Sequence, residues 1–207
     1  MNQPLIINTI TSTYEFRLKE KGSLFIGVAL PILLEGEASN KLDEIRKQYY
    51  DATHHCYAYK FANGKIKYSD NGEPNGTAGI RILNAINHFD LNDLIVIVIR
   101  YFGGTKLGVG PLGKAYYDCS FNCLNQANRI SKILYGRIVI EYQFEFSNLI
   151  HRLLSKHSAK IENTSFENTP QIQALLPWEN LNLIIEEIHS ASNSKIKTEI
   201  KDDILYI

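Results

Sequence analysis

The glycine-rich stretch RYFGGTKLGVGPLGKAY, residues 100–116, has the composition of an anion-binding loop. It holds five of the 13 glycines of the chain and follows a strongly apolar run at residues 94–99. Glycines let the backbone come close to a bound group, and a helix that starts after such a loop offers free N–H groups to an anion. Lys106 and Lys114 add full positive charges. The alternative is that the glycines serve tight turns and close packing.

The same stretch matches part of the phosphate-binding P-loop pattern. Residues 108–114 fit GxxxxGK, but the position that should carry Ser or Thr for magnesium holds Ala115. Pro111 also removes one N–H from the amides that would hold a phosphate. We therefore expect a phosphate group or polyanion, without a nucleotide–magnesium complex, to approach the backbone between Gly103 and Gly110.

A second polar loop, SDNGEPNGTAG at residues 69–79, combines turn residues with helix-capping residues and two carboxylates. Asn75 or Thr77 would cap the helix expected after it, and Asp70 and Glu73 would be favourable near the positive end of that helix. The same two carboxylates are candidates for positioning a ligand hydroxyl or a divalent ion. Because both polar loops link a strand to a helix, we expect them to share one rim of the sheet.

The stretch DATHHCYAY, residues 51–59, places His54, His55 and Cys56 side by side on an expected strand. Successive strand side chains point to opposite faces, so only His54 and Cys56 share a face, two ligands short of a structural zinc site. A histidine that hydrogen-bonds within the sheet and a Cys–His nucleophile pair both stay open. We expect no structural metal and no cofactor.

These motifs need a sheet to position them, and the hydrophobic pattern predicts one. After a polar leader, strands are predicted over residues 14–19, 23–30, 54–62, 65–70 and 94–99. Helices are predicted over residues 39–50, 75–89 and 111–127. Ser39 is the expected N-cap of the first helix, and Pro111 the expected first residue of the third.

The second half of the chain has a different pattern. It predicts strands over 135–144, 159–167, 171–178 and 195–200, and helices over 147–156 and 179–190. This βαββαβ order is typical of a ferredoxin-like domain. With a joint at residues 130–134, the sequence predicts an α+β protein of two domains, 1–132 and 135–207. The second domain lacks the aromatic signature of RNA-binding sheets and shows no site of its own.

Bulk composition excludes several classes of protein. The chain has 207 residues, of which 44% are hydrophobic and 21% charged, as in folded domains. Its 22 basic and 22 acidic residues balance, so no overall positive field indicates nucleic acid. Residues up to Leu134 nevertheless include 15 basic and 12 acidic ones, against 7 and 10 after it. We therefore assign any bound anion to the first domain.

Cysteine usage and the absence of targeting signals point to the cytoplasm. The three cysteines form no CxxC motif, which indicates reduced thiols, and Cys119 and Cys123, one helical turn apart, are expected in the core. No segment resembles a signal peptide or reaches the about 20 apolar residues of a membrane span. We expect a cytoplasmic protein without membrane contact.

The three motifs occur in order and together resemble the IMPACT/YigZ family over residues 16–125. The resemblance implies a left-handed β-α-β fold for the first domain, shared with a ribosomal small-subunit protein and domain IV of elongation factor G. It implies a second domain similar to domain V of that factor. Family members usually have a basic residue within the sequence Ser23-Leu24-Phe25, where this chain has Leu24, so one anion contact would be lost.

The resemblance further implies regulation of translation for eukaryotic members and contact with nucleic acid or ribosomes for bacterial ones. We therefore expect a non-enzymatic, translation-associated protein that binds RNA, the ribosome or a ribosome-bound partner protein through its glycine-rich face. Arg100 and Lys106 would meet phosphate, and Tyr101 or Phe102 would stack on a base. The candidate ligand-binding residues are Asp70, Glu73, Thr77, Arg100, Tyr101, Gly103, Gly104, Lys106 and Lys114.

Two other functions stay open. One is an enzyme acting on a phosphorylated small molecule, with Asp70 or Glu73 as base or metal ligand and the glycine loop as the phosphate site. The other is a regulator that acts purely through protein–protein interaction, with which the neutral overall charge agrees.

Overall fold

The computed structural model describes residues 3–166 and 169–207, and the chain divides into two compact units. Ile7–Ser131 form the body of the N-terminal unit, and Pro4–Ile6 with Lys132–Ile207 form the C-terminal unit. Both contain an antiparallel sheet and helices, so the predicted α+β class is confirmed. Glu167, assigned from sequence to a strand, lies outside the described residues, as do the first two residues of the leader.

The sheet of the N-terminal unit is built around its most apolar strand. Its order is β2 (Tyr14–Glu20), β3 (Ser23–Pro31), β6 (Leu94–Tyr101), β4 (His54–Lys60) and β5 (Ile66–Ser69), with every neighbouring pair antiparallel. Residues 94–99 are fully buried. A strand that lacks polar alternation needs cover on both faces, which is why β6 lies in the middle.

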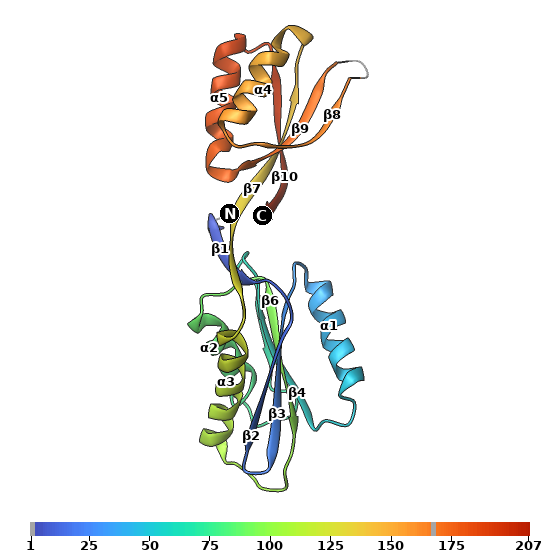
Figure 1. The fold of residues 1–207 in the computed structure, drawn as a ribbon, viewed down its shortest axis with the longest axis vertical. Coiled ribbons are helices and arrows are strands. Elements are labelled where there is room, and N and C mark those ends of the chain that lie inside the picture. The colour runs from blue at the N-terminus through green and yellow to red at the C-terminus, as the bar shows by residue number, and fades with distance from the viewer. Residues whose placement is uncertain (1–2, 167–168) are drawn as a thin grey trace. The chain divides into compact units, whose positions relative to one another are not determined.

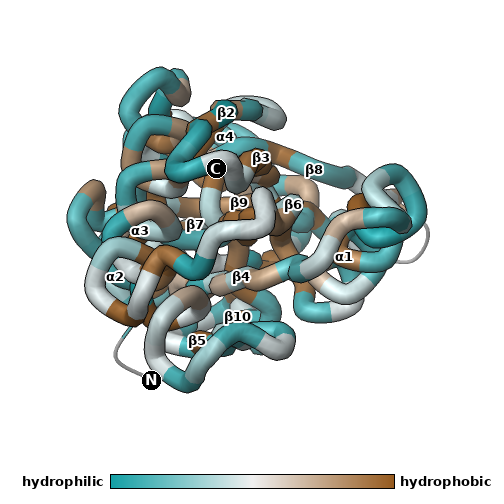
Figure 2. The backbone as a smooth tube through the Cα atoms, turned by 90° about the horizontal axis from the view of Figure 1, so that it is seen from below, coloured by the Kyte–Doolittle hydropathy of each residue, from teal (hydrophilic) through white to brown (hydrophobic). Residues whose placement is uncertain are grey.

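Three helices supply that cover. Figure 1 shows α2 (Gly79–His88) and α3 (Val109–Asn125) on one face of the sheet and α1 (Glu35–Gln48) on the other. Val96 and Val98 pack in the cluster with α2 and α3, whereas Ile95 and Ile97 pack with α1. In Figure 2, β6 lies among hydrophobic segments, while α1 alternates between hydrophilic and hydrophobic stretches.

The predicted helix starts need correction. α1 begins at Glu35, so Ser39 lies inside the helix, and the Glu37 carboxylate accepts the Leu33 N–H at 2.7 Å instead. α2 begins at Gly79, later than predicted. α3 begins at Val109, two residues before Pro111. Helix ends depend on which group satisfies the first N–H donors, and this partner is not always a neighbour in the sequence.

The segment assigned to a polar leader also needs correction, because it contains β1 (Ile6–Ile10). Ile7 and Ile10 are each 2% exposed. β1 pairs with the beginning of β7 (Arg129–Glu141), where Thr11 N–H donates to the Asn128 carbonyl oxygen at 3.1 Å. A strand whose partners lie so far along the chain has no hairpin signal to reveal it.

The C-terminal unit follows the expected βαββαβ order. Its elements after β7 are α4 (Ser147–Lys156), β8 (Lys160–Ser165), β9 (Gln171–Pro177), α5 (Leu181–Ser192) and β10 (Lys197–Tyr206), with short 3₁₀ turns at Phe144–Phe146 and Trp178–Asn180. β7 pairs with β9 and β10, and β9 also pairs with β8. α4 and α5 lie on one face of this sheet (Figure 1).

The first glycine of the glycine-rich loop packs against the turn between β2 and β3. A Cβ on Gly103 would lie 1.9 Å from the Gly22 carbonyl carbon and 2.4 Å from the Ser23 nitrogen. The Gly103 N–H also donates to Ser23 Oγ at 3.2 Å. Gly104 and Gly108, with φ of +84° and +83°, turn the chain. The group that approaches Gly103 is therefore the backbone of this same chain.

Gly103→Ala tests this contact, because the new methyl group has no room beside Gly22. We expect the variant to lower the free energy of unfolding by about 1–3 kcal/mol. Gly110→Ala is the matched control: it lies in α3, and beyond its chain neighbours and the adjacent α3 backbone no described atom lies within 4 Å of its added Cβ. It should leave the free energy unchanged or raise it by up to about 1 kcal/mol. Equal urea unfolding curves for both variants would contradict the close contact.

Candidate functional site

A pocket of about 430 Å³ opens on the α2–α3 side of the sheet in the N-terminal unit. The two polar loops meet here, as expected from their shared place between strands and helices. The lining residues are Thr53, His54, Glu73, Pro74, Arg100, Phe102, Lys106, Leu107, Gly108, Val109 and Leu112.

A buried ion pair forms the floor of this pocket. Arg100 at the end of β6 donates from Nη1 to Glu73 Oε1 at 2.6 Å, and the two side chains are 5% and 4% exposed. The Tyr116 hydroxyl of α3 donates to the same oxygen at 2.7 Å, and Arg100 Nη2 donates to Ser23 Oγ at 3.2 Å. Buried charges persist only when pairing and hydrogen bonds offset their desolvation, so this network holds both side chains in one arrangement.

Two aromatic rings contact the Arg100 guanidinium. Its Cζ atom lies 5.3 Å from the centre of the Phe25 ring and 5.4 Å from that of Phe102. Phe25 is fully buried, whereas Phe102 stays 44% exposed. Among the described residues, no group accepts a hydrogen bond from Arg100 Nε. The cation–π contact therefore holds an exposed aromatic ring at the rim of the pocket.

His54 lies opposite Arg100 in the β4–β6 register and lines the same pocket. Its Nδ1 is 2.8 Å from the Asn71 carbonyl oxygen, and its Nε2 is 3.8 Å from Glu73 Oε1. A carbonyl oxygen only accepts, so Nδ1 carries the proton and Nε2 of the neutral ring is an acceptor. Of the two open interpretations, hydrogen bonding by the histidine fits the structure.

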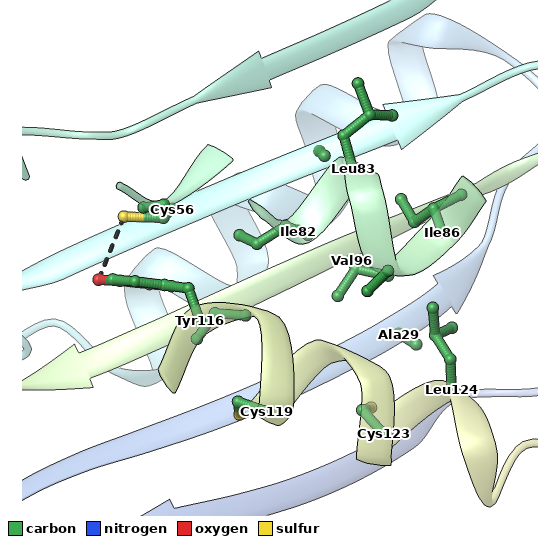
Figure 3. Close-up of a cluster of buried hydrophobic side chains, with 14 of the residues drawn as sticks. Ala29, Cys56, Ile82, Leu83, Ile86, Val96, Tyr116, Cys119, Cys123 and Leu124 are labelled. Atoms are coloured by element: carbon green, nitrogen blue, oxygen red, sulfur yellow. Dashed lines mark hydrogen bonds between the residues drawn. The ribbon is translucent and has the colours of Figure 1, made fainter. Parts of the chain in front are cut away.

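The Cys–His nucleophile pair is not supported. Cys56 is fully buried, and its thiol contacts the Asp70 carbonyl oxygen at 2.9 Å and the Tyr116 hydroxyl at 3.3 Å. Figure 3 shows this contact between β4 and α3. Burial raises the pKa of Cys56 to about 12, so the reactive thiolate is scarce at neutral pH. His55 points to the other face, where burial lowers its pKa and its Nε2 lies 3.0 Å from the Tyr49 carbonyl oxygen.

Asp70 is the cap of α2. Its Oδ1 accepts the N–H groups of Ala78 and Gly79 at 2.9 and 2.8 Å, and its Oδ2 accepts that of Gly76 at 2.9 Å. Asn75 and Thr77 were expected in this role, but the Thr77 hydroxyl donates to the Pro74 carbonyl oxygen at 2.6 Å. Both oxygens of Asp70 therefore serve the fold, which removes it from the candidate ligand contacts.

Tyr101 faces away from the pocket. Its hydroxyl donates to Asp51 Oδ1 at 2.8 Å, which raises the pKa of Tyr101, and its ring packs against the cluster under α1. Alternation along a strand sends neighbouring residues to opposite faces, so Phe102 is the aromatic residue at the pocket. This alternation is visible in the sequence and decides between the two rings.

The same alternation explains the departure at Leu24. Leu24 packs against the cluster under α1, whereas Phe25 belongs to the cluster under α2 and α3 and Ser23 contacts Arg100. A basic side chain at position 24 would start from the face opposite the pocket. The expected loss of an anion contact at this position is therefore not supported.

Of the remaining candidates in the glycine-rich stretch, one lines the pocket and the others lie elsewhere or shape the loop. Lys106 lines the pocket. Lys114 does not line it and pairs on the surface of α3 with Asp118, which raises the pKa of Lys114. Gly103 and Gly104 shape the loop. Tyr116 is not among the residues that the sequence predicts for the site, because only tertiary packing brings it to Glu73.

The described parts of the chain show neither a metal-binding cluster nor a membrane-spanning helix. Residues 3–166 and 169–207 contain no group of three or more His, Cys, Asp or Glu side chains placed to hold a metal ion. Within the same ranges, no helix has the length and apolar character needed to cross a bilayer.

The segment that carries this pocket matches a known family. Residues 21–124, half of the chain and all of the pocket lining, match the model of the Impact N-terminal domain. The chain belongs to the IMPACT family. IMPACT family member YvyE of Bacillus subtilis is 28% identical over 196 residues, covering 94% of this chain and 89% of that protein.

A second relative and a solved structure extend the similarity. An IMPACT family member encoded in a pol 5′ region of Thermus thermophilus is 32% identical over 155 residues, covering 75% of this chain and 84% of that protein. A crystal structure of a hypothetical protein aligns with a TM-score of 0.71 at 23% identity, covering 97% of this chain and 100% of the other. That likeness shows a shared fold.

Asp70→Ala tests the cap of α2 in this IMPACT family member. Three N–H groups lose their acceptor, so we expect the free energy of unfolding to fall by about 2 kcal/mol in urea denaturation. Asp70→Asn keeps one carbonyl acceptor and should lose less. An unchanged free energy in Asp70→Ala would show that the cap contributes little.

Thiol labelling tests the burial of the three cysteines. Burial raises the pKa of Cys56 and of Cys123 to about 12, and that of Cys119 is also raised. The thiolate forms only as pH rises towards such a pKa, so at about pH 8 iodoacetamide should leave the folded protein unmodified. The same reagent should modify all three cysteines after unfolding in guanidinium chloride, as intact-mass measurement would show. Rapid labelling of the folded IMPACT family member would contradict this arrangement.

Proposed function

We propose that this IMPACT family member is a translation-associated RNA-binding protein whose N-terminal pocket contacts the sugar–phosphate backbone of RNA. One observation carries the proposal: Phe102, Lys106 and the first turn of α3 surround a single concave pocket. An aromatic ring, a cation and backbone N–H donors are the three groups that single-stranded nucleic acid binding combines.

The rim favours an anion for two independent reasons. α3 is 17 residues long, and it begins at Val109 after the N-cap residue Gly108, without a side-chain cap or an acidic residue in its first turn. The start of such a helix carries partial positive charge, which stabilises a nearby anion by typically about 0.3–1 kcal/mol. Lys106 adds a full charge on the exposed loop beside it. A phosphate group at this rim would meet both.

The aromatic ring at the rim favours a nucleic acid over a simple anion. Phe102 is 44% exposed and lies over the Arg100 guanidinium. Stacking of one base on such a ring contributes about 1–3 kcal/mol and depends little on sequence. We therefore infer that one nucleotide places its phosphate at Lys106 and its base on Phe102.

Family membership supports the association with translation. The resemblance of the three sequence motifs implies this role for eukaryotic members. We also propose that the two units are similar to domains IV and V of elongation factor G. The enzyme alternative named Asp70 or Glu73 as base or metal ligand, and it is disfavoured because Asp70 caps α2 and Glu73 is held by Arg100 and Tyr116.

Lys106→Glu tests the proposal with a fluorescent single-stranded RNA titrated at several salt concentrations. We expect the affinity to fall at least about tenfold and the slope of log K against log salt to decrease by at least about 1, because one phosphate contact is lost. The free energy of unfolding should change by less than about 0.5 kcal/mol, since Lys106 is exposed.

Two further variants make this measurement specific. Lys47→Glu introduces the same charge change on α1, on the opposite face of the sheet, and should change the affinity far less than Lys106→Glu. Phe102→Ala should weaken binding by about 1–3 kcal/mol and leave the salt slope unchanged, because a stacked base releases no counterions. Unchanged affinity and slope in Lys106→Glu would overturn the proposed function.

A further inference from the structure

The floor of the pocket has a different chemistry from its rim. At the rim, Lys106 and the start of α3 are donors of positive character. At the floor, Glu73 presents a carboxylate, which only accepts hydrogen bonds. A ligand that fills the pocket must therefore offer an acceptor at one end and a donor at the other.

Glu73 has one oxygen that the protein does not use. Oε1 accepts from both Arg100 and Tyr116. The described residues donate no hydrogen bond to Oε2. Among their fully buried side-chain nitrogen and oxygen atoms, only Arg100 Nε lacks a hydrogen-bond partner, so Oε2 is not fully buried. Glu73 lines the pocket, so Oε2 is the oxygen of this carboxylate that remains for a hydrogen bond from a ligand.

The charges around Oε2 restrict the kind of ligand group that can donate a hydrogen bond to it. A phosphate at the floor would lie against the Glu73 carboxylate and be repelled. A cation would meet Arg100, 2.6 Å from the same carboxylate, as well as Lys106. With one negative and two positive side chains around it, the pocket disfavours a further positive charge. A neutral donor such as a hydroxyl group satisfies both restrictions.

We propose that Glu73 Oε2 accepts a hydrogen bond from the ribose 2′-hydroxyl of the nucleotide whose phosphate lies at the rim, so that the pocket selects RNA over DNA. This assignment rests on the proposed function and names its substrate class. The 2′-hydroxyl is the donor that distinguishes RNA from DNA. A pocket of about 430 Å³ is in the size range of small-molecule sites.

The experiment compares three fluorescent single-stranded oligonucleotides of one sequence on the full-length protein: RNA, DNA and 2′-O-methyl RNA. We expect RNA to bind about tenfold more tightly than either of the others, as for a hydrogen bond to a charged group. The DNA lacks the hydroxyl, and the methylated RNA keeps its oxygen but cannot donate. This comparison needs no variant and therefore does not depend on the folding of a mutant.

Glu73→Gln tests the residue itself. It removes the charge of the acceptor, and we expect the ratio of RNA to DNA affinity to fall towards one, with circular dichroism to verify the fold. Glu44→Gln, which removes a carboxylate from α1 on the other face of the sheet, should keep the wild-type ratio. Lys106→Glu should weaken RNA and DNA alike and also keep the ratio, since it acts on the phosphate.

The outcomes separate this inference from the proposed function. Equal affinity for RNA and DNA, with a salt slope that depends on Lys106, overturns the role of Glu73 and leaves RNA binding in place. Tight binding of 2′-O-methyl RNA likewise overturns it, because donation would not be needed. Failure of the wild-type protein to bind any of the three overturns the proposed function as well.

Discussion

The buried contact between Arg100 and Glu73 is the interaction on which the pocket depends. It joins the end of β6 to the loop before α2, and the hydroxyls of Tyr116 and Ser23 tie α3 and β3 to the same pair. Loss of one partner from a buried ion pair leaves an uncompensated charge, which costs about 3–5 kcal/mol. Four elements of the N-terminal unit are therefore held in register by one polar network at the base of the candidate site.

The two polar loops use similar residues for different physical tasks. In the loop before α2, Asp70 satisfies backbone donors, whereas Glu73 pairs with a charge from another strand. In the glycine-rich loop, Gly103 makes room for a neighbouring turn, and Lys106 extends into the pocket lining. A region rich in sequence motifs therefore has two tasks: its backbone must pack closely, and some of its polar side chains must stay exposed. The candidate ligand contacts are the few residues of this region whose polar groups are not all used in the hydrogen bonds and packing of the fold.

The similarity to the family covers the candidate site. The Impact N-terminal domain covers residues 21–124, which include every residue that lines the pocket. The relative from Bacillus subtilis matches 94% of the chain, so the C-terminal unit is part of the same similarity. The net positive charge also lies with the residues before 135, where the proposed phosphate contact is located.

Local pattern was sufficient for much of this protein. The bounds of α4 and the core positions of Cys119 and Cys123 follow from helical periodicity, and the burial of β6 follows from its unbroken apolar run. Strand alternation likewise sorts Tyr101 from Phe102. Tertiary structure alone decided which groups become partners: β1 with β7, Gly103 with Gly22, and Arg100 with Glu73. Each of these pairs is far apart in the chain, and no local propensity encodes which distant group will satisfy a buried charge or backbone donor.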